Sequence, residues 1–188
     1  MLFRSTTDPA AAVAQWIASP PTRDLLLHPG RILIGANKGK AGIALDLVEP
    51  AQPTTRGLPL TWPRAHQTVP AACAVGLLPP WLRELLQQKG RQPGDEVGMP
   101  VSLHFHRELL PTEIPAVSCR LTADREEVDG VFACVQRDGP PSEAANGCFV
   151  FVPLEPLKKN RVLAVEWTVP PNLLEKRQKF PRVEFAVQ

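Results

Sequence analysis

The sequence contains no tyrosine, no Cys-x-x-Cys pair and no apolar run near the roughly 18 residues that cross a membrane. Without Cys-x-x-Cys, neither a zinc knuckle nor a thioredoxin-type redox site is expected. The first residues, MLFRSTTDPAA, lack the apolar middle region of a signal peptide. We therefore expect no membrane span, and the chain as written carries no export signal.

Motifs of common enzymes are also missing. The pattern GxSxG of serine hydrolases does not occur, and neither does GxGxxG or the P-loop of nucleotide-binding proteins. The net charge is only +2, from 21 basic and 19 acidic residues, so the composition does not predict a nucleic-acid partner. These patterns predict a chain that is not an enzyme and holds no cofactor or metal.

Proline, by contrast, is abundant. The 188 residues include 22 prolines, more than twice the average usage of roughly 5%. Prolines at this density end helices and strands, so the composition favours a β domain with irregular connections. The apolar content of 44% is sufficient for a sizeable core.

The clearest strand signal is the stretch Cys148–Val169. In Cys148–Val152 both alternating sets of side chains are apolar, which predicts a strand covered on both faces. Pro153 and Pro156 end it, because proline cannot donate to a sheet ladder. Val162–Val169 is a second β-rich run, and the two strands are predicted to form the core hairpin of a small sandwich.

From Met99 onward, short apolar runs follow one another at the spacing of a sandwich. The expected strands are Val101–Phe105, Ala116–Thr122, Gly130–Gln136, Cys148–Val152, Val162–Val169 and Arg182–Val187. The segment Asp124–Gly130 reads as a polar turn.

The N-terminal part predicts one helix and one hairpin. Asp8 and Pro9 have the character of a helix N-terminus. Apolar alternation before and after the turn Asn37–Lys40 predicts the hairpin. Because one helix and one hairpin are marginal alone, this segment needs a partner surface.

The region Glu49–Gly98 is rich in proline and glycine, which interrupt helices and strands. We predict a linker near Glu49–Arg56, an edge strand that includes Leu58, Leu60 and Trp62, and a short helix Pro80–Gln88 with Gly90 just past its end.

The N-terminal segment resembles the C-terminal part of a bacterial CAP domain, the superfamily of cysteine-rich secretory proteins, antigen 5 and pathogenesis-related 1 proteins. The residues that carry the resemblance are Trp16, Ser19, Pro20, Arg23, Leu26, Leu27, Pro29, Ile34 and Gly35. Thr22 stands where the family usually has a histidine. The first half of the domain is missing, which implies an N-terminally truncated piece, so no cleft chemistry or metal site carries over.

The rest of the chain resembles the Ig-like β-sandwich that follows CAP domains in some bacterial surface or secreted proteins. The matching residues are Gly98, Pro100, Val101, Leu103 and Phe105, then Phe151, Pro153, Pro156 and Leu157. The expected fold is mainly β, with a partial α/β CAP-like segment in residues 1–48, a linker in 49–56 and the sandwich in 57–188.

These resemblances imply a non-catalytic accessory or adhesion-like module of an extracellular or cell-envelope protein. Its implied partners are the missing N-terminal half of the CAP-like domain and a cell-surface glycan or protein. Two alternatives stay open: a fragment of a CAP-type hydrolase or lytic enzyme without its catalytic half, and a carbohydrate-binding module. In the last case Trp62 and Trp81, predicted in loops or at an edge, would contact the sugar.

The remaining reactive side chains have ordinary interpretations. His104 and His106 alternate on one strand, but a metal needs a third ligand, so we interpret them as solvent-facing. Glu126 and Glu127 read as a solvated turn. The short basic groups Lys158–Arg161 and Lys176–Lys179 are read as solubilising charges.

The chain has four cysteines: Cys73, Cys119, Cys134 and Cys148. As small apolar residues they would be buried thiols. The alternative is one disulfide among Cys119, Cys134 and Cys148 in an exported domain. The sequence does not choose between these readings.

Overall fold

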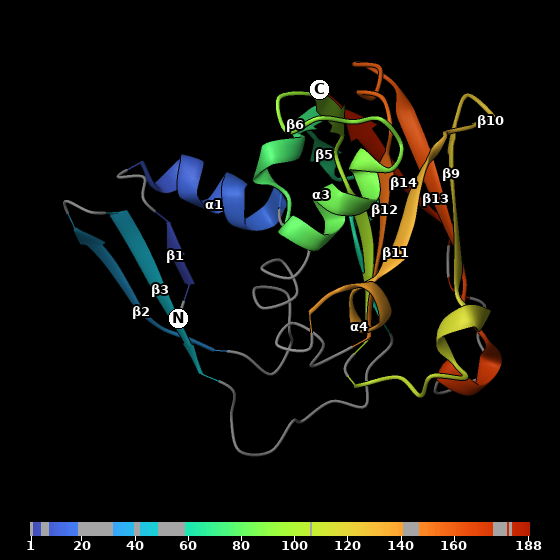
Figure 1. Cartoon of the computed structure of the whole chain (residues 1–188), viewed down its shortest axis with the longest axis horizontal. Coiled ribbons are helices and arrows are strands. Elements are labelled where there is room, and N and C mark those ends of the chain that lie inside the picture. The colour runs from blue at the N-terminus through green and yellow to red at the C-terminus, as the bar shows by residue number, and fades with distance from the viewer. Residues whose placement is uncertain are drawn as a thin grey trace.

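The computed structural model describes residues 2–4, 8–18, 32–39, 42–48, 59–105, 107–140, 147–174, 180 and 182–188. Within these residues the regular structure is mainly β, as the proline content and the alternation predicted (Figure 1). The strands in this described part of the chain form four sheets, of five, four, three and two strands. The two largest sheets hold most of the core.

The four-stranded sheet is antiparallel throughout and has the order β11-β12-β8-β4. Its strands are β4 (Leu60–Trp62), β8 (Val101–His104), β11 (Gly130–Cys134) and β12 (Cys148–Pro153). β4 lies at an edge, as predicted, whereas Leu58 lies outside the described residues.

The five-stranded sheet has the order β10-β9-β13-β14-β5. Its strands are β5 (Thr68–Val69), β9 (Ser118–Ala123), β10 (Glu126–Glu127), β13 (Val162–Thr168) and β14 (Val183–Val187). All of its pairs are antiparallel except β5 with β14, which is parallel. All six strands expected after Met99 are present in the two large sheets, within a few residues of their expected ends.

Aromatic side chains join these two sheets. Phe132 of β11 and Trp167 of β13 have ring centroids 6.5 Å apart, although the strands belong to different sheets. The indole Nε1 of Trp167 also donates a hydrogen bond to Thr61 Oγ1 of β4, at 3.1 Å. The two sheets therefore face each other across one hydrophobic cluster, to which both contribute.

The prediction for β12 is confirmed in one respect and wrong in another. All six of its residues are buried, so the strand is covered on both faces as expected. However, β12 pairs with β11 and β8, whereas β13 pairs with β9 and β14. The two strands do not form a hairpin, because the chain leaves β12 at Pro153 and crosses to the other sheet through residues 154–161.

Helices and a small sheet pack beside the four-stranded sheet. α3 (Pro80–Gln87) contacts β11, and α4 (Val135–Asp138) contacts β11 and β12. α3 begins with proline and is followed by Gly90 at φ 81°, as the sequence predicted. The predicted long loop also contains β6 (Ala72–Ala74), β7 (Glu96–Gly98) and the 3₁₀-helix η1 (Val75–Leu77), while η2 (Ile114–Ala116) and η4 (Pro171–Leu173) lie in later connections.

The N-terminal segment forms the predicted helix and hairpin. α1 (Pro9–Ala18) buries Ala12 and Trp16, and β1 (Leu2–Arg4), β2 (Ile32–Gly39) and β3 (Gly42–Val48) form a sheet of order β1-β3-β2. The predicted turn Asn37–Lys40 is wrong for its first three residues, because β2 continues to Gly39, which pairs with Gly42.

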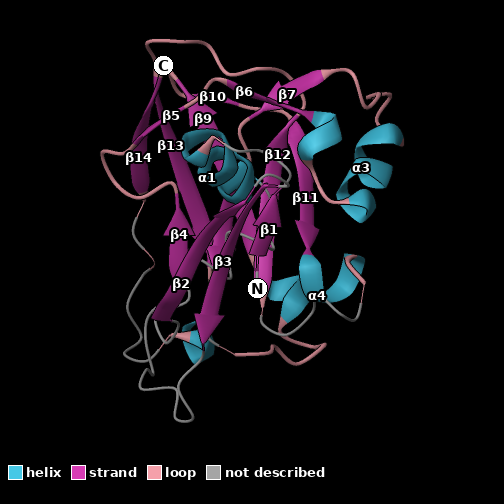
Figure 2. Cartoon of the chain, turned by 90° about the vertical axis from the view of Figure 1, so that its left-hand side faces the viewer, coloured by secondary structure: helices cyan, strands magenta, loops and turns pink. Residues whose placement is uncertain are grey.

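Figures 1 and 2 show this segment on the side of the four-stranded sheet that faces away from the five-stranded sheet. The predicted linker Glu49–Arg56 lies outside the described residues, as do positions 19–31 of the CAP-like motif. No helix in the described part of the chain is long and apolar enough to span a bilayer.

Candidate functional site

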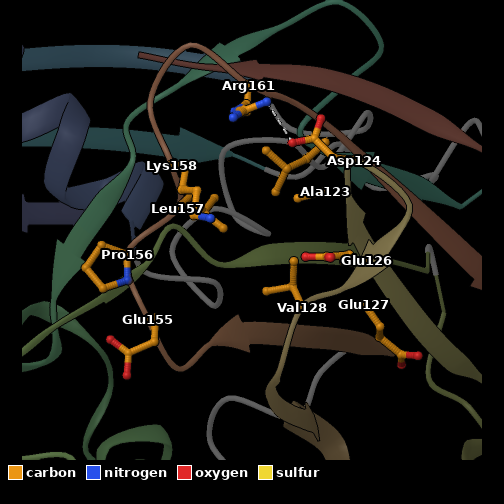
Figure 3. A pocket seen from close by; sticks show the side chains of 11 residues that line it. Ala123, Asp124, Glu126, Glu127, Val128, Glu155, Pro156, Leu157, Lys158 and Arg161 are labelled. Atoms are coloured by element: carbon orange, nitrogen blue, oxygen red, sulfur yellow. Dashed lines mark ion pairs between the residues drawn. The ribbon is translucent and has the colours of Figure 1, made fainter.

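A surface pocket of about 190 Å³ opens between the β9–β10 hairpin and the connection from β12 to β13 (Figure 3). Its walls come from segments that are far apart in the sequence but meet where the two large sheets end. Its lining residues are Ala123, Asp124, Glu126, Glu127, Val128, Glu155, Pro156, Leu157, Lys158, Arg161 and Leu163.

The base of the pocket is aliphatic. Leu157 and Leu163 are buried and belong to the hydrophobic core, and Val128 packs against the same core while half-buried. None of the described residues that line the pocket is aromatic. The base can therefore contact a small aliphatic group but offers no ring for stacking.

The rim carries both signs of charge. Glu126 and Glu127 lie on the hairpin side with Val128, and Lys158 lies on the opposite side with Leu157 and Pro156 (Figure 3). All four of the rim carboxylates and both of the rim cations are exposed. Long-range attraction at such a rim is screened by salt, so the charges act on groups in direct contact.

Most of these rim charges already have a partner. Arg161 pairs with Asp124 at 2.9 Å, Glu127 pairs with Arg120 at 3.7 Å, and Glu155 pairs with Arg91. Lys158 and Glu126 form no ion pair with each other or with any other residue in the described part of the chain. Each of the two walls thus carries one unpaired charge, and the two are opposite in sign.

Backbone hydrogen bonds fix both walls. In the hairpin, Asp124 and Arg125 adopt left-handed conformations (φ 51° and 74°), and the Val128 N–H donates to Leu121 O at 2.9 Å. In the facing connection, the Leu157 N–H donates to Ala71 O and the Asn160 N–H to Val187 O, both at 2.8 Å. The pocket therefore exists before any ligand binds.

A shallower hollow of about 180 Å³ adjoins this pocket on the outer face of the five-stranded sheet. It shares Asp124 and Leu163 with the first, and Ala164 lies at its base. At its edge Arg182 pairs with Glu166 and with Glu184, at 3.3 Å in each case. Of its two cations, Arg125 and Arg182, the second already has carboxylate partners.

The prediction that His104 faces solvent is wrong. His104 is 2% exposed, its Nε2 lies 2.7 Å from the hydroxyl oxygen of buried Ser102, and Cys148 is its partner in the neighbouring strand. The face that bears them is the one turned away from the five-stranded sheet and is itself covered. A buried polar pair of this kind stabilises the fold when hydrogen-bonded. His106 lies outside the described residues.

The tryptophans do not form an exposed platform. Trp62 is 5% exposed and Trp81 is 8% exposed, and both belong to the hydrophobic core. Trp62 lies on an edge strand and Trp81 in the first turn of α3, so position alone suggested exposure. The prediction that these indoles contact a sugar depended on their being exposed, and they are buried.

All four cysteines are thiols, so the alternative of a disulfide is not met. Burial raises the pKa of the Cys119 thiol, and burial likewise raises the pKa of Cys134. Both thiols therefore stay protonated at neutral pH and are poor nucleophiles. Across the described residues, no group of three or more His, Cys, Asp or Glu side chains has the arrangement of a metal site.

An ion pair organises the loop that follows β8. Both guanidinium NH2 groups of Arg107 donate to the Glu113 carboxylate, at 2.8 and 2.9 Å, and the Leu110 N–H donates to it at 2.8 Å. The hydrogen bonds from Arg107 lower the pKa of Glu113 below its ordinary value. The carboxylate stays ionised and holds the turn.

We expect Glu113→Gln to remove an acid-dependent part of the stability. Because the pKa of Glu113 is depressed in the folded state, its contribution is present above its unfolded pKa of about 4.3 and is lost as the pH falls through the folded value. The pair is half-exposed on the arginine side, so the loss at pH 7 should be about 0.5–1 kcal/mol.

Urea unfolding at pH 7 and at pH 3 measures this effect. Wild type and Glu113→Gln should differ at pH 7, and the difference should narrow as the pH falls to 3, whereas Glu96→Gln, at an exposed position of β7, should track wild type at both. An equal difference between wild type and Glu113→Gln at both pH values would show that the carboxylate charge is not what stabilises the loop.

Sequence reasoning found the pocket residues only one by one. Glu126 and Glu127 are exposed as predicted, although they form strand β10 rather than a turn. Lys158 and Arg161 lie in the predicted basic turn, and all four side chains gather at one pocket. The only local signal was the turn-forming Asp124-Arg125 pair before two carboxylates. The second basic group, Lys176–Lys179, lies outside the described residues.

The chain was compared with family models, curated proteins and solved structures. No family model matches it, and no curated protein or solved structure matches it either.

Proposed function

We propose that the chain is a non-catalytic recognition module: an Ig-like β-sandwich that serves as an accessory or adhesion-like part of a bacterial CAP-superfamily protein outside the cell. It would bind a cell-surface glycan or protein with the loops at one end of the sandwich. The observation that carries the proposal is the preformed pocket between the β9–β10 hairpin and residues 155–161. Loops on a rigid scaffold are the usual place for recognition.

The order of the strands supports the Ig-like assignment. Ig sandwiches have strands A, B, E and D in one sheet and G, F and C in the other, and variable-type domains add C′ beside C. The orders β4-β8-β12-β11 and β14-β13-β9-β10 follow this scheme when the strands are lettered along the chain. The core tryptophan differs, because Trp167 lies on the strand equivalent to F rather than to C.

The N-terminal segment supports the accessory role. Its helix and hairpin follow each other in the order expected of the end of a CAP domain, and α1 buries Trp16. The protonated thiols and the buried Ser102–His104 pair do not line the pocket, so among the described residues no cysteine, serine or histidine is available there for catalysis. Binding without turnover is the function that such a lining supports best.

Binding to arrays of cell-surface glycans and surface-protein fragments tests this proposal. We expect one class of component to bind, and Lys158→Glu or Glu126→Lys to weaken it by about fivefold, the effect of one contact charge. Lys159→Glu is the matched control, because Lys159 is exposed next to Lys158 but does not line the pocket. Turnover of an ester, peptide or glycan substrate that is lost in Ser102→Ala would contradict the proposal and favour the hydrolase alternative.

A further inference from the structure

The size of the pocket limits its ligand to a small molecule. A volume of about 190 Å³ is below the roughly 300–1,000 Å³ of pockets that take drug-sized ligands. An engineered apolar cavity of about 150 Å³ is large enough for benzene, so a group of a few carbon atoms fills a space of this order. The base of Val128, Leu157 and Leu163 is aliphatic, which favours a branched aliphatic group over a polar one.

The charges of the rim indicate which charged groups such a ligand should carry. Lys158 on one wall favours an anionic group, and Glu126 on the facing wall favours a cationic group (Figure 3). Neither charge is used in an ion pair within the described structure, whereas Asp124, Glu127 and Glu155 each already have an arginine partner. A ligand with one charge of each sign therefore satisfies both walls without breaking an existing ion pair.

Backbone hydrogen bonds hold the main chain of both walls in place. The Leu157 N–H, next to Lys158, donates to Ala71 O, and the Val128 N–H, close to Glu126, donates to Leu121 O. Because Lys158 and Glu126 form no ion pair with each other in the described structure, a ligand that bridges them breaks none. Preorganisation of this kind raises affinity by lowering the ordering cost of binding.

We propose that this pocket binds a free aliphatic α-amino acid in its zwitterionic form. The carboxylate of the ligand contacts Lys158, its ammonium contacts Glu126, and its branched side chain covers Val128 and Leu157. The inference rests on the proposed function insofar as both use the same pocket, and it adds the class of ligand. Because the contacts are few and exposed, the dissociation constant should be on the order of 1 mM.

An NMR titration of the ¹⁵N-labelled full chain with L-leucine tests the proposal. We expect saturable amide shifts that cluster at Glu126, Val128, Leu157 and Lys158. Two analogues of leucine each lack one charge: 4-methylpentanoate has no ammonium, and 3-methylbutylamine has no carboxylate. Each should bind about threefold to fivefold more weakly than leucine, because it loses one charge contact.

Exposed-site variants separate the two ends of the ligand. Lys158→Met should weaken leucine binding and leave 4-methylpentanoate no tighter than 3-methylbutylamine, whereas Glu126→Gln should weaken leucine and 3-methylbutylamine but not 4-methylpentanoate. Lys159→Met should bind as wild type does. The inference is overturned if leucine causes no saturable shifts, if they cluster elsewhere, or if one singly charged analogue binds as tightly as leucine.

The same experiments distinguish the two proposals. Binding to a surface glycan or protein that is weakened by Lys158→Glu, with no leucine binding, overturns the amino-acid inference and leaves the recognition module standing. Leucine binding at this pocket with no surface component bound by the arrays overturns the adhesion-like role and leaves the ligand assignment standing.

Discussion

Replacing Phe149 with alanine will lower the free energy of unfolding by about 3–5 kcal/mol, the usual cost of removing a buried phenylalanine ring. Phe149 is among the largest fully buried side chains. Its ring stacks on Phe132 at a centroid distance of 5.8 Å and meets the edge of Phe105 at 5.9 Å. Because Phe132 in turn contacts Trp167 of the other sheet, the substitution leaves a cavity in the layer that joins the two sheets.

Urea unfolding followed by tryptophan fluorescence measures the effect, with Val162→Ala as the control. Val162 lies on β13 and is 59% exposed, so its truncation should change stability by less than about 0.5 kcal/mol. A domain of this size has a total stability of about 5–15 kcal/mol, so Phe149→Ala is expected to shift the midpoint far below that of the control. Equal midpoints for the two variants would contradict the assignment of Phe149 to a shared core.

Replacing Gly130 with alanine will destabilise the chain by about 1–3 kcal/mol, as overpacking a close contact does. A Cβ at position 130 would clash with Cζ of Phe151 and lie 2.7 Å from the backbone oxygen of Val152. The oxygen belongs to the backbone of a central strand that pairs with both of its neighbours. It cannot move away without disturbing the four-stranded sheet.

Gly94→Ala is the matched control for this prediction. A Cβ at Gly94 meets nothing within 4 Å, so the substitution should be neutral or stabilise by about 0.4–1 kcal/mol through the unfolded state. Thermal and urea unfolding of the two variants should therefore move in opposite directions or differ by more than the error. If Gly130→Ala is as stable as Gly94→Ala, the close approach of β11 to β12 is not as described.

The strands after Met99 could be predicted from the sequence because alternation is a local signal. Apolar periodicity gave β8, β9, β11, β12, β13 and β14 within a few residues. The pairing of strands is not a local property. β12 and β13 are neighbours in the chain, yet β12 ends at a proline and the chain then crosses to the other sheet. A turn rich in lysine looks the same in a hairpin and in a crossover between sheets.

The burial of certain polar and aromatic side chains could not be predicted either, because it depends on elements that are distant in the sequence. The alternation of Ser102 and His104 with valine and leucine indicates one polar face, and such a face normally meets water. Here that face is covered, so both side chains are buried and hydrogen-bonded to each other. Trp62 and Trp81 are buried because elements distant in sequence cover an edge strand and a short helix.

The candidate site was the part least accessible to sequence reasoning. Its two walls are a short hairpin and a connecting loop, and charges in such short elements have no periodicity that indicates what they face. Only the strand order brings the β9–β10 hairpin opposite residues 155–161 and leaves Lys158 and Glu126 on facing walls. Without the fold, each of these charges is most simply interpreted as solubilising.

The central claim is that the four-stranded and five-stranded sheets face each other and thereby hold the walls of the pocket in position. Proton–proton NOE measurements on the full chain test it most directly. The account predicts NOEs from the indole ring of Trp167 to the ring of Phe132 and to the methyl group of Thr61, together with backbone NOEs between Ala164 and Thr122. Backbone NOEs that pair β12 with β13 as a hairpin, with none between Trp167 and Phe132, would contradict it.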